Sequence, residues 1–320
     1  MKKLTTLILS FCALVVFAQD EIILNQNYSS PLSVNPAFAG SAGRTRVAVN
    51  YFNQYPGTGS TNVKSSVSAD HYFGKIKGGI GIIASSFVAE DGVYNFGSYS
   101  LIYSAHIPLA EKLVIKPAIQ LGFGNKKIMT EFCFPPPPNP SLKPIFLEQF
   151  GYSKIRFIDV SAGFIIYNEK YFGGAMVYHI AEPYMYTEKS IEETTDSYVL
   201  PMRYDIHGGL NLFTESKIQI TPTARIVITD RMELYRVICA AALKGYRMGL
   251  GYERSGIMDY DNYHLLLGFV GKKFSIVYNY VFFVSQLNNQ HLGSHEFSFT
   301  WLFGKKDKTP EITCPVINGI

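Results

Sequence analysis

The stretch 294-SHEFSFTWLF-303 decides the fold class, because its residues alternate between two chemically unlike faces. One face carries His295, Phe297, Phe299, Trp301 and Phe303, and the other carries Glu296, Ser298 and Thr300. A period of two is the mark of a β-strand with one apolar and one polar face. About ten residues is also the length that a tilted membrane strand requires. The stretch therefore predicts a membrane strand.

The same alternation recurs along the chain, for example in 202-MRYDIHGGLNLF-213 and 217-KIQITPTARIVIT-229. Short connections such as GKIK, LAEK, NEK, TES, KGY and GKK alternate with longer ones, including 53–62, 126–154, 183–201 and 286–293. An even number of strands with this rhythm is typical of an outer-membrane barrel. We predict an all-β, transmembrane antiparallel β-barrel over residues 44–303. Its fourteen strands are 44–52, 63–72, 77–88, 93–107, 113–125, 155–167, 170–182, 202–213, 217–228, 233–243, 245–254, 260–271, 272–285 and 294–303.

A secreted β-sandwich would also contain many alternating strands. The length of the strands and the isolated charges on their polar faces favour a barrel with a polar lumen. These charges are Arg46, Asp159, Arg203, Asp205, Arg225 and Glu296. Arg203, Asp205 and His207 lie two residues apart on one wall, which would suit a proton relay. We favour the alternative that they form, together with Arg225, a lumenal charge network whose members pair with one another.

The first residues indicate export. Residues 1–18 combine Lys2 and Lys3 with an apolar run, which is the pattern of a signal peptide. The formal net charge of +4 falls to +2 when both lysines are removed, so nothing favours a nucleic-acid partner. Short turns of outer-membrane barrels are periplasmic. We therefore predict an integral outer-membrane protein with outer-membrane lipids around it and both termini in the periplasm.

No group of residues predicts catalysis. No serine has a nucleophile-elbow setting, and no Cys/His cluster has metal-ligand spacing. The glycine-rich run 78-GGIGI-82 lacks the strand–turn–helix setting of a phosphate loop, and we interpret it as relief of crowding in a curved sheet. We expect no enzyme activity, no cofactor and no metal.

Two irregular segments are candidate partner surfaces. The loop containing Cys133 carries a proline run that is pre-extended for binding, or that serves as a stiff spacer; its candidate residues are Phe134, Pro135, Pro136, Pro137 and Pro138. The tail 304–320 continues beyond the last strand into the periplasm. It would contact a partner or fold into the barrel mouth, and its candidate residues are Lys305, Lys306, Cys314 and Pro315.

A rigid turn, 34-VNPAFAG-40, precedes the first strand. Pro36 fixes its own φ and biases Asn35 toward extended backbone. Gly40 and Gly43 permit a sharp reversal, so Phe38 is directed to the barrel mouth. We predict that residues 19–43 form a short plug or rim on the periplasmic side, with a turn made of Asn35, Pro36, Ala37, Phe38, Ala39 and Gly40.

This opening, 25-NQNYSSPLSVNPAFAGSAGRTRVAVNYFNQYPG-57, resembles the start of the PorP/SprF family of type IX secretion outer-membrane proteins, including its NPAxAG turn. The closing 293-GSHEFSFTWLFGKK-306 and the Cys-Pro pair at 314–315 are similar to the family's end. The resemblance implies a non-enzymatic barrel of the type IX secretion and gliding machinery. Such a protein helps to export or surface-anchor a large cargo protein with a type IX C-terminal domain, and couples it to periplasmic machinery.

The alternative is a channel for hydrophobic small molecules, since a fourteen-stranded barrel with an NPA segment also looks like the fatty-acid channel family. An apolar tunnel through the lumen would favour the channel. A lumen filled by charged side chains and the N-terminal segment would favour the scaffold.

Overall fold

The computed structural model describes residues 23–26, 29–60, 62–128, 153–184, 199–212, 218–230, 232–256, 260–283, 292–304 and Cys314. The predicted signal peptide, the proline run of the 129–152 connection and most of the tail lie outside these residues.

The described chain is almost entirely β-structure. Its strands are β1 (Thr45–Gln54), β2 (Val63–Phe73), β3 (Gly78–Ala89), β4 (Tyr94–Ala105), β5 (Ile107–Ala110), β6 (Leu113–Ile128), β7 (Ser153–Tyr167), β8 (Tyr171–Tyr178), β9 (Arg203–Leu210), β10 (Ile218–Ile228), β11 (Glu233–Leu243), β12 (Tyr246–Ser255), β13 (Tyr260–Val270), β14 (Phe274–Phe283) and β15 (Ser294–Phe303). No helix in the described part of the chain has the length and apolar character needed to cross a membrane.

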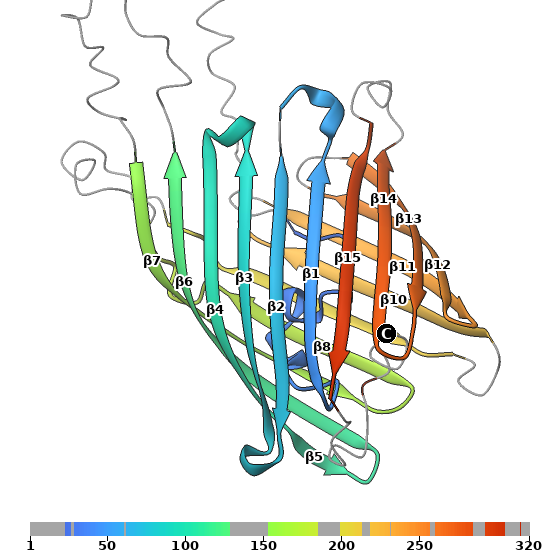
Figure 1. Ribbon diagram of the computed structural model, residues 1–320. Coiled ribbons are helices and arrows are strands. Elements are labelled where there is room, and N and C mark those ends of the chain that lie inside the picture. The colour runs from blue at the N-terminus through green and yellow to red at the C-terminus, as the bar shows by residue number, and fades with distance from the viewer. Residues whose placement is uncertain are drawn as a thin grey trace, which may run out of the picture.

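The strands form one closed antiparallel sheet. Consecutive strands pair with each other except β4 and β5, β1 pairs with β15, and β4 pairs with β6 over Tyr94–Ser104. The short β5 continues the line of β4 along the same partner, β6. The result is a barrel of fourteen long strands with one short extra strand (Figure 1). The predicted fold class is confirmed.

The two faces of the strands separate as the alternation predicts. In β15 the exposed and buried residues alternate, with Phe297, Phe299 and Trp301 on the outside and Glu296, Ser298 and Thr300 buried in the lumen. Exposed Ile, Leu, Val, Tyr and Phe residues cover the outer face of the other strands as well. This apolar outside with a polar inside is the arrangement of a membrane barrel.

Most predicted strands differ from the observed ones by one to three residues at an end, and two differ more. The predicted 93–107 strand is divided at His106 into β4 and β5, although both pair with β6 in one register, with Ser104 opposite Ala118 and Ile107 opposite Ile115. The predicted 170–182 strand ends at Tyr178. His179 and Glu182 both have positive φ (60° and 39°), a left-handed backbone that cannot continue a strand.

Candidate functional site

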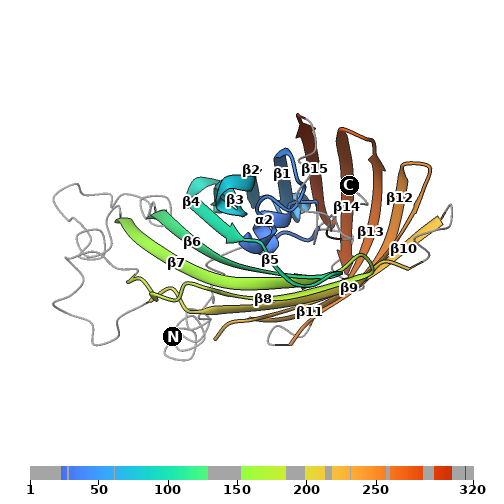
Figure 2. The same ribbon diagram turned by 90° about the horizontal axis from the view of Figure 1, so that it is seen from below.

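The segment before β1 lies inside the barrel. Two short helical turns, α2 (Pro31–Val34) and η1 (Pro36–Phe38), stand within the ring of strands in both views (Figures 1 and 2). Its hydrogen bonds to β15 advance in step with the chain: the amides of Asn25 and Gln26 bond Glu296, and the Ser29 carbonyl accepts from Thr300 Oγ1 at 3.0 Å. The segment therefore runs along the lumen from the end with the long connections to the end where β1 begins.

The turn predicted at Asn35–Gly40 lies at this second end, where the short connections are. Asn35 has extended backbone (φ −155°, ψ 121°), and its Oδ1 accepts from the Ala37 amide at 2.9 Å, which caps η1. Its Nδ2 donates to the Phe164 carbonyl at 3.1 Å and approaches His207 Nε2 at 3.1 Å. One amide side chain thus forms the turn and attaches it to β7 and β9.

Charged side chains from the barrel wall bind the backbone of the same turn. The Gly40 amide donates to Asp70 Oδ2 at 2.7 Å, Arg46 Nη2 donates to the Phe38 carbonyl at 3.0 Å, and Lys116 Nζ donates to the Ala39 carbonyl at 2.5 Å. Arg46 also forms a buried ion pair with Asp70 at 2.8 Å. Hydrogen bonds with a charged partner contribute about 1.5–3 kcal/mol each, so the turn is firmly held.

The turn approaches the wall so closely that two glycines are required. Gly40 has φ +71°, and a Cβ there would lie 2.6 Å from the Cα of Gly79. A Cβ on Gly79 would lie 2.1 Å from the Ala39 carbonyl oxygen. Gly79 belongs to the run 78–82, so at least this glycine serves the contact with the plug rather than the curvature of the sheet.

Phe38 and the tail share one apolar cluster at this end. Phe38 is fully buried with Leu32, Val34 and Ala37 against Ile102, Ile165, Tyr167 and Leu302, and Cys314 belongs to the same cluster. Cys314, a candidate for partner contact, is thus buried in the barrel mouth. The other tail candidates, Lys305, Lys306 and Pro315, lie outside the described residues, as do Phe134 and Pro135–Pro138 of the predicted loop.

At the long-connection end, two charged side chains hold the backbone of Leu24–Gln26. Glu296 Oε2 accepts from the amides of Asn25 (2.7 Å) and Gln26 (3.0 Å). Arg236 Nη1 donates to the carbonyls of Leu24 (3.0 Å) and Asn25 (3.2 Å), while its Nε donates to Glu253 at 2.6 Å. The side chain of Leu24 packs with Phe52, Phe87, Phe96, Ile155, Phe157 and Leu200 near this mouth.

The four residues of the predicted lumenal network separate into different environments. Arg225 and Asp205 form a buried ion pair, with 2.6 Å between Nη2 and Oδ2. His207 lies beside Asn35 and 5.6 Å from the Phe38 ring, so it contacts the plug. Arg203 stacks over the Tyr178 ring at 3.8 Å and lines a cavity with Asp159 and His179.

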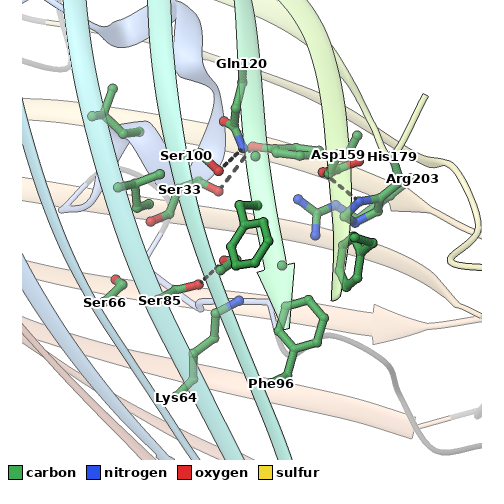
Figure 3. Close-up of a pocket in the computed structure, with 18 residues that line it drawn as sticks. Ser33, Lys64, Ser66, Ser85, Phe96, Ser100, Gln120, Asp159, His179 and Arg203 are labelled. Atoms are coloured by element: carbon green, nitrogen blue, oxygen red, sulfur yellow. Dashed lines mark hydrogen bonds and ion pairs between the residues drawn. The ribbon is translucent and has the colours of Figure 1, made fainter. Parts of the chain in front are cut away.

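That cavity, about 70 Å³, lies between α2 and the wall formed by β2–β9 (Figure 3). Serine and glutamine side chains form much of its lining, namely Ser33, Ser66, Ser85, Ser98, Ser100 and Gln120. Asp159 and His179 form a 3.0 Å ion-pair contact at one side, and Lys64 projects from the other. Apolar side chains, among them Ile83, Phe96 and Phe157, complete the lining, so the cavity has a mixed polar and apolar surface.

Several residues that hold the plug were not predicted as site residues: Asp70, Lys116, Arg236, Glu253 and Gly79. All except Gly79 carry a charge on the polar face of a strand, which is the signal that identified Arg46 and Glu296. What the alternation does not show is which of these charges bind the N-terminal segment. In the described part of the chain no group of His, Cys, Asp or Glu could hold a metal ion.

The sequence matches the model of one protein family over residues 16–301, described as type IX secretion system membrane protein PorP/SprF. The chain belongs to the PorP/SprF family. This PorP/SprF protein is therefore a type IX secretion membrane protein with an outer-membrane barrel fold. The resemblance of its sequence to the PorP/SprF family is confirmed. A search of curated proteins finds no significant match.

Solved structures similar to this PorP/SprF protein are outer-membrane barrels of very different sequence. A Pseudomonas aeruginosa FadL homologue shares 9% identity with a TM-score of 0.49, covering 87% of this chain and 98% of that one. The Ralstonia pickettii toluene transporter TbuX shares 7% identity with a TM-score of 0.49, covering 84% and 92%. The Acinetobacter baumannii protein Omp33 shares 7% with a TM-score of 0.45, covering 81% and 98%. At these sequence identities and TM-scores, the similarity carries no conclusion about function.

Proposed function

We propose that this protein is a non-enzymatic scaffold of the type IX secretion and gliding machinery in the outer membrane. It helps to export or surface-anchor a large cargo protein that carries a type IX C-terminal domain, and it couples that cargo to periplasmic components. The observation that carries the proposal is the lumen, which holds the N-terminal segment and buried ion pairs such as Arg46–Asp70, Arg225–Asp205 and Arg236–Glu253. A filled, charged lumen is poorly suited to passing hydrophobic solutes.

In the proposed orientation, the short turns and the NPAFAG turn face the periplasm and the long connections face outward, as in other barrels. Cys314 then lies at the periplasmic mouth, in keeping with a periplasmic C-terminal tail. Ile23 packs beside Val227, Met232 and Leu234 at the opposite mouth. The expectation of two periplasmic termini is therefore retained for the tail, whereas the N-terminal segment reaches the outer mouth at Ile23.

The test compares cells that lack the protein with cells complemented by variants. Deletion of residues 134–144 is expected to release a surface protein into the medium, and truncation after Lys306 to lose a periplasmic contact while sparing the cargo. Mass spectrometry of medium, surface and co-purified proteins measures both. If neither deletion changes these proteins while uptake of a hydrophobic solute falls, the channel is the correct function and the scaffold is wrong.

A further inference from the structure

The contacts at the outer mouth hold the chain by its backbone. Glu296 accepts from two successive amides and Arg236 donates to two successive carbonyls, so four of the bonds here are to main-chain atoms of Leu24, Asn25 and Gln26. Every peptide has these donors and acceptors. Side chains of the segment contribute as well. Asn25 Oδ1 accepts from Arg236 Nη2 at 3.0 Å, and Gln26 Nε2 donates to the carbonyls of Val277 and Glu296, both at 3.1 Å.

Both charged residues are buried, and Arg236 is held by a second residue of the barrel wall. Arg236 and Glu296 are both almost completely buried, at 1% and 0% exposure. Glu253 orients the guanidinium through its Nε and is itself bonded by Asn262 Nδ2 at 2.8 Å. The donor position of Arg236 is therefore set by the barrel wall, whereas the hydrogen bonds of the Glu296 carboxylate are those to the segment. Within the described residues, Glu296 Oε1 has no hydrogen-bond partner, so the carboxylate retains acceptor capacity.

We propose that Arg236, Glu253 and Glu296 form a binding site for an extended peptide backbone. The protein's own residues Leu24–Gln26 occupy this site, and another extended peptide can take their place. The hydrogen bonds to backbone atoms predict weak selectivity except at positions 24 and 26, where the Leu24 and Gln26 side chains contact the wall. This inference rests on the contact geometry and does not depend on the proposed secretion function, so either can fail alone.

Substitutions in the bound segment test backbone recognition without changing the barrel wall. In the full-length protein, Asn25→Pro removes the amide that donates to Glu296, whereas the matched control Asn25→Ala keeps it and loses only the side-chain contact. We expect hydrogen–deuterium exchange in the fragment covering residues 23–30 to be at least about tenfold faster in Asn25→Pro than in Asn25→Ala. Thr223→Val, which removes a lumenal hydrogen bond to the Ile238 carbonyl, controls for general loosening. Equal exchange in the two Asn25 variants would overturn the proposal.

Peptides added to the Asn25→Pro protein test exchange of the occupant. The probes are a synthetic peptide of residues 22–30, a version scrambled at all positions except 24 and 26, and a version with proline at positions 25 and 26. The first two should bind saturably with affinities within about threefold, and the third at least about tenfold more weakly. The tethered segment has a high effective concentration, so the wild-type protein should bind all three weakly. Binding of the native peptide but not the scrambled one would replace backbone recognition with side-chain recognition, and absence of binding to Asn25→Pro would refute a replaceable occupant.

Discussion

A methyl group on Gly79 should detach the plug turn from the barrel wall. In Gly79→Ala the added Cβ would lie 2.1 Å from the Ala39 carbonyl oxygen and 2.5 Å from the Gly40 nitrogen, both of them backbone atoms. No rotamer change can relieve contacts with backbone. Either β3 bends away from its partners or the turn moves by more than 1 Å, and the turn is the less constrained of the two because no sheet contains it.

The consequence follows from the bonds that the turn would lose. Asp70, Arg46 and Lys116 each bind a backbone atom of residues 38–40, at 2.5–3.0 Å. At about 1.5–3 kcal/mol for each charged hydrogen bond, loss of all three would cost roughly 4–9 kcal/mol. Partial readjustment of the turn and access of water reduce this loss. We therefore expect the docked state of the plug to be destabilised by about 2–4 kcal/mol, with little effect on the stability of the strands.

The measurement is hydrogen–deuterium exchange at residues 36–41 in detergent, which should accelerate by about 30-fold or more at 2 kcal/mol. Gly173→Ala is the matched control, because a Cβ there meets only the His207 carbonyl oxygen at an ordinary 3.7 Å. Both variants should keep a folded barrel on an unheated gel. If exchange in Gly79→Ala equals that in Gly173→Ala, the close packing of plug and wall is not what holds the turn.

The remaining predictions concern the barrel, its topology and the turn. Unheated and boiled samples should migrate differently on a denaturing gel, because a barrel leaves no strand edge unpaired; equal migration would count against the fold. A membrane-impermeant thiol reagent on intact cells should modify Cys133 and spare the buried Cys314, and labelling of Cys314 would reverse the orientation. Asn35→Ala should destabilise the docked turn by about 1–2 kcal/mol through loss of its cap, measured by exchange against Asn35→Ser, which keeps a capping oxygen and loses only the Nδ2 donor. Pro36→Ala combined with Gly40→Ala should leave insertion intact but lose cargo retention or partner binding, and wild-type behaviour on both counts would make the turn incidental.

The sequence predicts the barrel well because the alternation of apolar and polar residues within each strand shows which side chains face the membrane and which face the lumen. In 294–303 the alternation alone separates Phe297 and Trp301 from Glu296 and Thr300, and the structure places the two sets outside and inside. The strand ends are less predictable. β8 ends at Tyr178, where His179 and Glu182 adopt positive φ although neither is glycine, and such a conformation leaves no trace in the alternation.

The plug illustrates the same limit at longer range. Residues 34–40 show by themselves that a rigid turn will form, because proline and glycine act on their own backbone. They do not show that Asp70, Lys116 and Gly79 will meet that turn, since these residues come from three different strands. Polar residues on an inner face indicate only that something polar is nearby.

The two ends of the plug are held by different chemistry, and this difference bears on how the protein could act. At the short-turn end the contacts depend on shape as well as charge: Gly40 needs Gly79 opposite, Asn35 caps its own turn, and Phe38 fills an apolar cluster. At the outer end Arg236 and Glu296 bind mainly the main chain. Because the two ends are held by separate sets of residues, the proposed displacement of Leu24–Gln26 would not require the turn to move. In the proposed orientation, a peptide that arrives from outside the cell would therefore have only the contacts of Leu24–Gln26 to displace, with the turn still bound at the periplasmic end.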